Sequence, residues 1–146
     1  ALPDNRYLTE SNAILNYLAA ETHLLPTDSF ELAKVQQWQF FEQYSHEPYI
    51  AVARFIAKYL GLSKDRLAEY KAKHHNGYKA LSVMETQLTT TPYLIGEQLT
   101  TADISLYAYT HVAHEGGFQL ADYPAILAWL ERIQGQPNYI TMNSIN

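Results

Sequence analysis

Hydrophobic and polar residues follow one another along most of the chain with the three-to-four-residue spacing of amphipathic helices. Turn-forming residues interrupt this pattern at intervals, and each interruption marks an expected helix end. The pattern predicts helices over 10–21, 29–60, 63–88, 100–115 and 124–134. The chain is therefore expected to be helical over most of its length.

The longest of these segments, 29–60, contains signals for its start, a bend and its end. Asp28 followed by Glu31 resembles a capping box, in which side chains satisfy the first free amides of a helix. Pro48 has no amide donor, so we expect a kink one turn before it. Gly61 is expected to end the segment.

The helix that Ser63 opens carries a regular row of residues alternately three and four positions apart, which predicts a seam packed along another helix. The seam consists of Leu67, Tyr70, His74, Gly77, Leu81, Met84 and Leu88. Gly77 lowers the helix propensity by about 1 kcal/mol. We expect the close approach of a neighbouring helix to compensate for this loss.

The last two expected helices differ in how their apolar residues are distributed. Thr100 and Asp103 form a second capping box, with Leu99 and Ile104 placed as a hydrophobic staple. The residues that follow are apolar on nearly every face, which predicts the buried central helix of the domain. Pro124 starts the final helix. Its residues expected to face inward are Ile126, Leu127, Leu130 and Ile133.

The N-terminal stretch differs from the helical body. Asp4 and Asn5 predict a turn between two short extended pieces, so 1–9 is expected to form a small hairpin. The helix over 10–21 follows it. The apolar residues on one side of this helix are Ile14, Leu15, Leu18 and Ala19. Since the sequence starts with Ala1 and not with Met, we expect it to be a piece of a longer protein.

The composition excludes several classes of protein. A net charge of −5, with Lys and Arg scattered singly, does not provide the basic surface of a nucleic-acid binder. No apolar run approaches the ~20 residues of a membrane span, and no secretory signal is visible. The chain has no cysteine, which excludes disulfides, thiolate metal sites and a cysteine nucleophile within it. We expect a cytoplasmic protein without nucleic-acid or membrane partners.

Most candidate chemical groups have a simpler explanation. The pairs His74-His75 and His111/His114 lack the number of ligands and the spacing of a metal site, so we expect no metal. Asp103 is explained by helix capping.

The stretch YSHEPYI over 44–50 is different, because it combines aromatic and acidic residues with the expected kink. Tyr44 and Glu47 either pack in the core or line a substrate pocket beside that kink. The residues alone favour neither interpretation.

Five stretches together resemble the cytosolic glutathione transferases, and the bacterial members in particular, over essentially the whole chain. The stretches are TESNAI at the start of a helix, LLP in a linker, VQQWQFFEQ, YLIGEQLTTADISL and YPAILAWLERI. The most specific elements are Glu10-Ser11-Asn12-Ala13-Ile14 and the box formed by Thr100 and Asp103.

This resemblance implies a fold and two domains. Residues 22–146 would form an all-α helical bundle of the glutathione transferase C-terminal type. Residues 1–21 would be the end of a thioredoxin-like glutathione-binding domain, a short β-hairpin followed by a helix. The portion that carries the family's thiol-activating Tyr, Ser or Cys would precede Ala1, so we expect no catalytic residue in this chain.

The resemblance also implies a binding site at the start of the first helix. The family's Glu/Gln–Ser pair, which binds the γ-glutamyl end of glutathione, matches Glu10 and Ser11. A helix N-terminus attracts the γ-glutamyl carboxylate, and Glu10 can meet its ammonium group. The alternative is that Ser11 only caps its helix. The candidates for a wall that holds an electrophile are Tyr44, Glu47, Tyr107 and His111.

The implied parent protein is a cytoplasmic homodimer that conjugates the glutathione thiolate to a hydrophobic electrophile. Glutathione would be its co-substrate, with no other cofactor, and the chain alone would be inactive. One alternative is a non-catalytic interaction module, since translation factors reuse this helical fold. The other is a glutathione-dependent isomerase or dehalogenase on the same scaffold. Retention of Glu10 and Ser11 favours a glutathione user over a pure interaction module.

Overall fold

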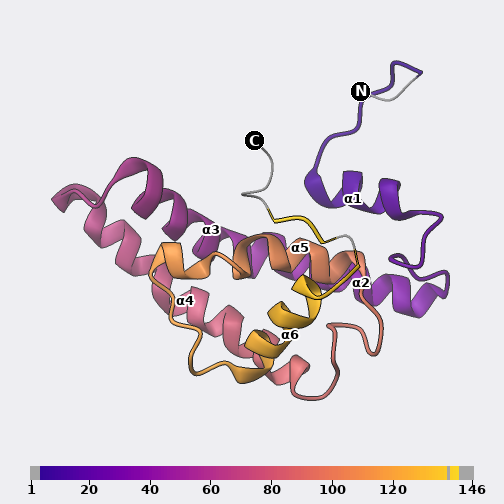
Figure 1. Cartoon of the computed structure of the whole chain (residues 1–146). Coiled ribbons are helices and arrows are strands. Elements are labelled where there is room, and N and C mark those ends of the chain that lie inside the picture. Colours follow the sequence, from indigo (N-terminus) through magenta and orange to yellow (C-terminus); the bar gives the residue numbers. More distant parts are fainter. Residues whose placement is uncertain (1–3, 138, 142–146) are drawn as a thin grey trace.

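The computed structural model describes residues 4–137 and 139–141, which fold into a bundle of helices (Figure 1). The α-helices are α1 (Ser11–Ala19), α2 (Ser29–Phe41), α3 (Glu47–Phe55), α4 (Lys64–Leu88), α5 (Thr101–Thr110) and α6 (Pro124–Gln134). Shorter helical turns are η1 (Glu42–His46), η2 (Ile56–Leu60) and η3 (Ala113–Gly116). The described residues contain no strand, so the expected all-α class is confirmed.

A nearly continuous helical run extends from α2 through η1 and α3 to η2. Asp28 caps its start, because its Oδ1 accepts hydrogen bonds from the amides of Phe30 and Glu31, each at 3.0 Å. The π-helical turn η1 lies directly before α3, where Pro48 provides no donor. Gly61 ends the run with a φ of 76°. The predicted start and end of this segment are confirmed, and the irregular turn η1 lies where the kink was expected.

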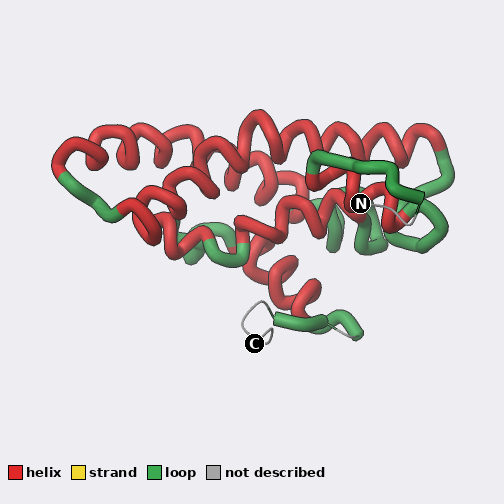
Figure 2. The backbone as a smooth tube through the Cα atoms, turned by 90° about the horizontal axis from the view of Figure 1, so that it is seen from above, coloured by secondary structure: helices red, strands yellow, loops and turns green. Residues whose placement is uncertain are grey.

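The helix α4 packs beside α3, and the loop between their ends forms one extremity of the molecule (Figure 2). The predicted seam of α4 is buried from Gly77 onward, whereas Leu67 near its start is 36% exposed. A Cβ atom on Gly77 would collide with the ring of Phe118, and Ile50 of α3 is the next neighbour. The close neighbour is thus an aromatic ring that follows η3, in addition to the expected helix.

The capping box at the start of α5 is present, and its Asp103 does more than cap. The buried carboxylate accepts hydrogen bonds from the amide and the hydroxyl of Thr100, from the amide of Leu94 and from the indole N–H of Trp129, each at 2.9 Å. These donors come from α6, the start of α5 and the loop before it. Burial raises the pKa of Asp103, against the lowering effect of its four donors.

The hydrophobic core surrounds α5, as expected for a central helix, and every α-helix except α1 contributes to it. Its buried residues are Val35, Trp38, Ile50, Ala53, Leu81, Met84, Leu88, Tyr93, Leu94, Ala102, Leu106, Tyr107, Ala113, Phe118, Ile126, Trp129, Leu130 and Ile133. The helix α1 instead lies on the outside of this body (Figure 1).

One inward residue of α6 was predicted wrongly. Ile126, Leu130 and Ile133 are buried, but Leu127 is 39% exposed. Trp129 is fully buried and belongs to the same helical stripe, whereas Leu127 flanks it. The hydrogen bond from Trp129 to Asp103 fixes which side of α6 faces the core.

Two expectations for the N-terminal stretch also need correction. Residues 4 and 5 form a turn, but 6–9 form no strand, and 1–3 lie outside the described residues. An extended segment becomes a strand only by pairing, and none of the described residues pairs with 6–9. In α1, Ile14 and Leu18 of the expected apolar side are 38% and 70% exposed.

Replacing Asp103 with Asn should test how far this carboxylate supports the fold. The amide keeps the shape of the side chain but turns an NH₂ group toward two buried donors. We expect the free energy of unfolding, measured by urea titration, to fall by about 3 kcal/mol. Asp65→Asn, in the exposed first turn of α4, should change it by less than about 0.5 kcal/mol. Equal losses in both variants would contradict the role of Asp103.

Candidate functional site

The N-terminus of α1 is exposed and lacks a side-chain cap. Glu10 occupies the cap position with a φ of 67°, which non-glycine residues rarely adopt, and its side chain makes no capping hydrogen bond. Ser11, the first helical residue, is exposed and does not stand at the cap position. Capping therefore does not account for Ser11. The first amides of the helix are open to an acceptor from outside the chain.

A cavity of about 340 Å³ lies beside this helix start, between α1 and α2. Its lining residues are Glu10, Ser11, Asn12, Ala13, Asn16, Gln36, Gln39, Phe40 and Gln43. Five of them are Asn or Gln, which can both donate and accept hydrogen bonds. Of this set, the sequence identified Glu10 and Ser11 as site residues. The others were missed because the pairing of α1 with α2 is a tertiary feature.

Two asparagines hold α1 against the bundle. Asn12 and Asn16 lie one helical turn apart on its inner side, and both amides are hydrogen-bonded at donor–acceptor distances of 2.7–3.2 Å. Their partners are Gln39 on α2, Glu42 on η1, and Thr101 and Ser105 on α5. Polar contacts thus hold the start of α1 in place, while of the predicted apolar side Ala19 is buried and Ile14 and Leu18 are exposed.

A second cavity, of about 280 Å³, lies between α1, η1 and α5 and shares Ser11 and Asn12 with the first. Its other lining residues are Leu15, Glu42, Ile104, Ser105, Ala108 and Tyr109. The sequence predicted that α5 is a buried central helix, apolar on nearly every face. The structure instead leaves one face of α5 open toward the start of α1.

The candidates Tyr44 and Glu47 do not line either of these cavities. Tyr44 is 79% exposed and borders a smaller cavity of about 190 Å³ that η1 forms with α4. Glu47 is half-buried at the start of α3. Burial, and to a lesser extent the nearby Glu42 carboxylate, raises the pKa of Glu47. Its assignment to an electrophile wall stays a prediction.

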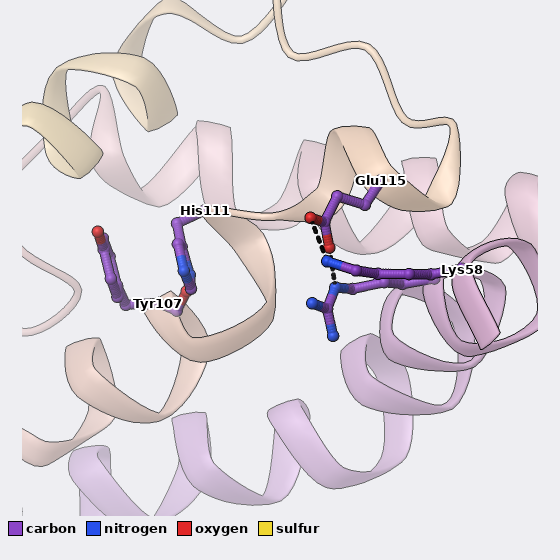
Figure 3. Close-up of polar contacts among 5 residues, drawn as sticks. Lys58, Tyr107, His111 and Glu115 are labelled. Atoms are coloured by element: carbon purple, nitrogen blue, oxygen red, sulfur yellow. Dashed lines mark hydrogen bonds and ion pairs between the residues drawn. The ribbon is translucent and has the colours of Figure 1, made fainter. Parts of the chain in front are cut away.

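Tyr107 and His111 lie one turn apart on α5 and stack face to face, with ring centroids 4.6 Å apart (Figure 3). The Tyr107 hydroxyl is 2.6 Å from the hydroxyl of Tyr139 and accepts a hydrogen bond from Gln134. Burial, followed by the contact with Tyr139, raises the pKa of Tyr107 to about 12. The pair therefore packs toward the residues after α6. The structure does not bring it together with Tyr44.

His46 is a buried residue that the sequence did not single out. It ends η1, is fully buried, and its Nε2 lies 2.9 Å from the Oγ1 of Thr110 on α5. Its Nδ1 has no hydrogen-bond partner among the described residues. Burial lowers the pKa of His46 from 6.5 to about 3, so the imidazole is neutral in the folded chain. The position of His46 beside Pro48 was visible in the sequence. The packing of α5 against η1, which buries His46, was not.

Two of the four histidines considered as metal ligands, His74 and His111, have structural contacts. Both ring nitrogens of His74 lie within 3.1 Å of backbone carbonyls, those of Tyr70 and Gly116. Within 4–137 and 139–141, no three or more His, Asp or Glu side chains gather as a metal site would require. None of the helices in that part of the chain combines the length and the apolarity that crossing a membrane requires.

Residues 38–137, from within α2 to the end of the helical body, match the family described as glutathione S-transferase, C-terminal domain. The chain belongs to the glutathione S-transferase family. This match covers the helical run from the last residues of α2 to η2, together with α4, α5 and α6. It agrees with the fold that the resemblance implied.

Relatives of known name extend the glutathione S-transferase match to nearly the whole chain. A crystal structure of glutathione S-transferase from Pseudomonas fluorescens is 59% identical, with a TM-score of 0.95 over 97% of this chain and 70% of that one. The glutathione S-transferase-like protein FUS3 of Gibberella fujikuroi is 34% identical over 94% of this chain and 72% of its own length. Elongation factor 1-gamma of Artemia salina is 35% identical over 77% of this chain but only 26% of its own length.

The buried His46 predicts an acid sensitivity of this glutathione S-transferase domain. Below pH 6.5 the unfolded chain protonates this histidine, whereas the folded chain resists protonation until about pH 3. The unfolded state then binds more protons, so His46 lowers the free energy of unfolding by about 1.4 kcal/mol for each pH unit below 6.5. Urea titrations across this range should show a shallower pH dependence in His46→Gln.

The exposed His75 provides the matched control for this experiment. His75→Gln should keep the pH dependence of the unmodified chain. An unchanged pH dependence in His46→Gln would contradict a neutral buried imidazole.

Proposed function

We propose that this chain forms part of a glutathione S-transferase and contributes the γ-glutamyl end of the glutathione site. The observation that carries the proposal is the uncapped start of α1, where Glu10 and Ser11 border a cavity of about 340 Å³. Free amides, a hydroxyl and a carboxylate meet at this point. This is the set of groups that a zwitterionic amino-acid end requires.

Each group would have a distinct task in binding. The γ-glutamyl carboxylate accepts hydrogen bonds from the Ser11 hydroxyl and the first amides of α1, where the helix dipole also favours negative charge. The Glu10 carboxylate pairs with the ammonium group of the same moiety. The strained φ of Glu10 costs on the order of 1–3 kcal/mol, and holding a carboxylate at the cavity edge is a function that explains it.

The proposed activity of the full-length protein is conjugation. The glutathione thiolate forms a bond to an electrophilic carbon of a hydrophobic substrate, and that carbon releases its leaving group with the bonding electron pair, as chloride from an aryl chloride. A thiolate stabilised at neutral pH is the reactive form. We assign no residue of this chain to thiol activation. The second cavity is the better-placed electrophile wall, because it shares Ser11 with the first and exposes one side of α5. Tyr44, Glu47, Tyr107 and His111 remain more distant candidates.

The proposed domain division places 1–21 with a thioredoxin-like domain and 22–146 in the helical domain. The exposure of Ile14 and Leu18 on α1 supports it, because the rest of a thioredoxin-like domain would cover that side. We further propose that the parent protein is a cytoplasmic homodimer that uses glutathione as co-substrate and no other cofactor.

A second candidate is a non-catalytic interaction module. The similarity to elongation factor 1-gamma, a protein named for a role in translation, favours it. The open start of α1 argues for the first candidate, because a module that binds only proteins does not need free amides beside a carboxylate. A glutathione-dependent isomerase or dehalogenase would use the same γ-glutamyl contacts and differ in the second cavity.

Glutathione binding should be visible at the start of α1 in an isotope-labelled chain followed by NMR. We expect glutathione and γ-glutamylcysteine to shift the amide signals of Ser11 and Asn12, whereas cysteinylglycine, which lacks the γ-glutamyl group, should not. Ser11→Ala should weaken binding about tenfold, since a hydrogen bond to a charged group is lost. Ser63→Ala, at the start of α4, should not. Equal shifts with cysteinylglycine would refute the assignment.

Conjugation should require more than this chain. We expect the 146-residue chain, mixed with glutathione and chlorodinitrobenzene, to produce conjugate no faster than the uncatalysed reaction. The full-length protein should be retained on immobilised glutathione and conjugate the same electrophile. Conjugation by the chain alone would disprove the absence of thiol activation, and a parent protein that is not retained would favour the interaction module.

A further inference from the structure

The end of the molecule opposite α1 combines positive charge with exposed apolar side chains. It consists of residues 54–73, which comprise the last residues of α3, η2, the loop 61–63 and the first turns of α4 (Figures 1 and 2). We refer to residues 54–73 as the basic tip. The proposed glutathione site makes no use of it.

The basic residues of the chain are spaced singly but concentrated in this tip. Six of the ten Lys and Arg lie there, together with two of the fifteen Asp and Glu. The rest of the chain carries four basic and thirteen acidic residues. Glu115 of η3 pairs with both Arg54 and Lys58, at 2.5 and 2.6 Å (Figure 3). Even with this carboxylate included, six cations face three anions.

Large apolar side chains are exposed among these cations. Phe55 is 52% exposed and Tyr59 61%, and their ring centroids are 5.7 Å apart. Leu60 and Leu62, on either side of the turn, are 45% and 49% exposed. Single exposed apolar residues are ordinary, but four within the eight positions 55–62 form a candidate binding surface.

We propose that the basic tip binds the surface of a membrane that contains anionic lipids. The lysines and arginines attract the headgroups, while Leu60 and Leu62 enter the boundary between headgroups and acyl chains. Tyr59 has the amphipathic character that places tyrosine rings at this boundary, and the ring of Phe55 adds apolar surface beside it. The site is peripheral, so it requires no membrane-spanning helix.

The negative charge of the whole chain does not oppose this binding at close range. Glu85, near the other end of α4, lies roughly 30 Å from Lys64 along the helix. The Debye length at physiological ionic strength is about 8 Å, so distant carboxylates are largely screened. A nucleic acid would use the cations and rings but would leave Leu60 and Leu62 in water. A lipid surface therefore accounts for more of the exposed groups.

The proposal can be tested by sedimentation of the chain with lipid vesicles. We expect it to bind vesicles of phosphatidylcholine mixed with phosphatidylserine, to lose that binding at high salt, and to ignore vesicles of phosphatidylcholine alone. Equal binding to both vesicles, or tighter binding to an oligonucleotide or an acidic peptide than to the mixed vesicles, would overturn the proposal.

Two pairs of variants separate the tip from the rest of the surface. Leu60→Ser with Leu62→Ser should weaken vesicle binding about tenfold or more, and so should Lys64→Glu with Lys71→Glu. The controls make equivalent changes elsewhere. Leu18→Ser with Phe30→Ser removes side chains that are 70% and 69% exposed, and Lys34→Glu with Lys79→Glu makes the same charge change. Both controls should bind like the unmodified chain.

The apolar control has a second purpose, because α1 also exposes apolar side chains. Vesicle binding through α1 would be lost in the Leu18→Ser control and would not depend on salt, and that result would contradict the role of the tip. Thermal unfolding followed by circular dichroism confirms that each variant is folded. The two tip variants alter different residues. If one of them does not fold, the vesicle binding of the other still tests the proposal.

Discussion

The buried carboxylate of Asp103 is the interaction on which the arrangement of this chain depends. Its two oxygens accept four hydrogen bonds, which join α6, the start of α5 and the loop before it. Burying a charge is costly, as the raised pKa of Asp103 indicates. Those donors recover much of that cost only in one geometry. The carboxylate therefore fixes how α5 and α6 are oriented relative to each other.

The orientation of α5 in turn positions the candidate site. Thr101 and Ser105 follow the capping box on the same helix, and they donate hydrogen bonds to Asn16 and Asn12 of α1. A shift of α5 would therefore move the start of α1, where Ser11 borders both cavities. Residues far from the cavities can thus affect the geometry of the proposed glutathione site through this chain of contacts. The apolar core holds the bundle together, whereas these polar contacts set the location of the site.

Features that arise from neighbouring residues could be predicted from the sequence. The cap at Asp28, the irregular turn before Pro48, the end at Gly61 and the box at Thr100 all depend on contacts within a few positions. The inner side of α1 could be predicted only in part, because Ala19 of its apolar stripe is buried, but the polar contacts of Asn12 and Asn16 were not foreseen.

The site was only partly accessible from the sequence for the same reason. Glu10 and Ser11 were identified through a family resemblance, and their neighbours in the two cavities come from helices distant in the sequence. His46 was missed because its burial depends on how α5 packs against η1. The sequence shows the singly spaced Lys and Arg between 54 and 73, but only the structure shows that these residues lie at one end of the molecule.

Exposed apolar side chains occur at both ends of this molecule, and the charges near them indicate which kind of surface each end can bind. The acidic residues nearest to α1 in the sequence are Asp4, Glu10 and Glu21, and Arg6 pairs with Asp4 at 2.6 Å. An acidic apolar surface of this kind would be repelled by anionic lipid, and a protein domain is the cover that fits it. At the tip the same kind of side chain is surrounded by cations, which reverses that argument. One end therefore suits a protein surface, as the proposed thioredoxin-like domain would provide, and the other suits an anionic surface.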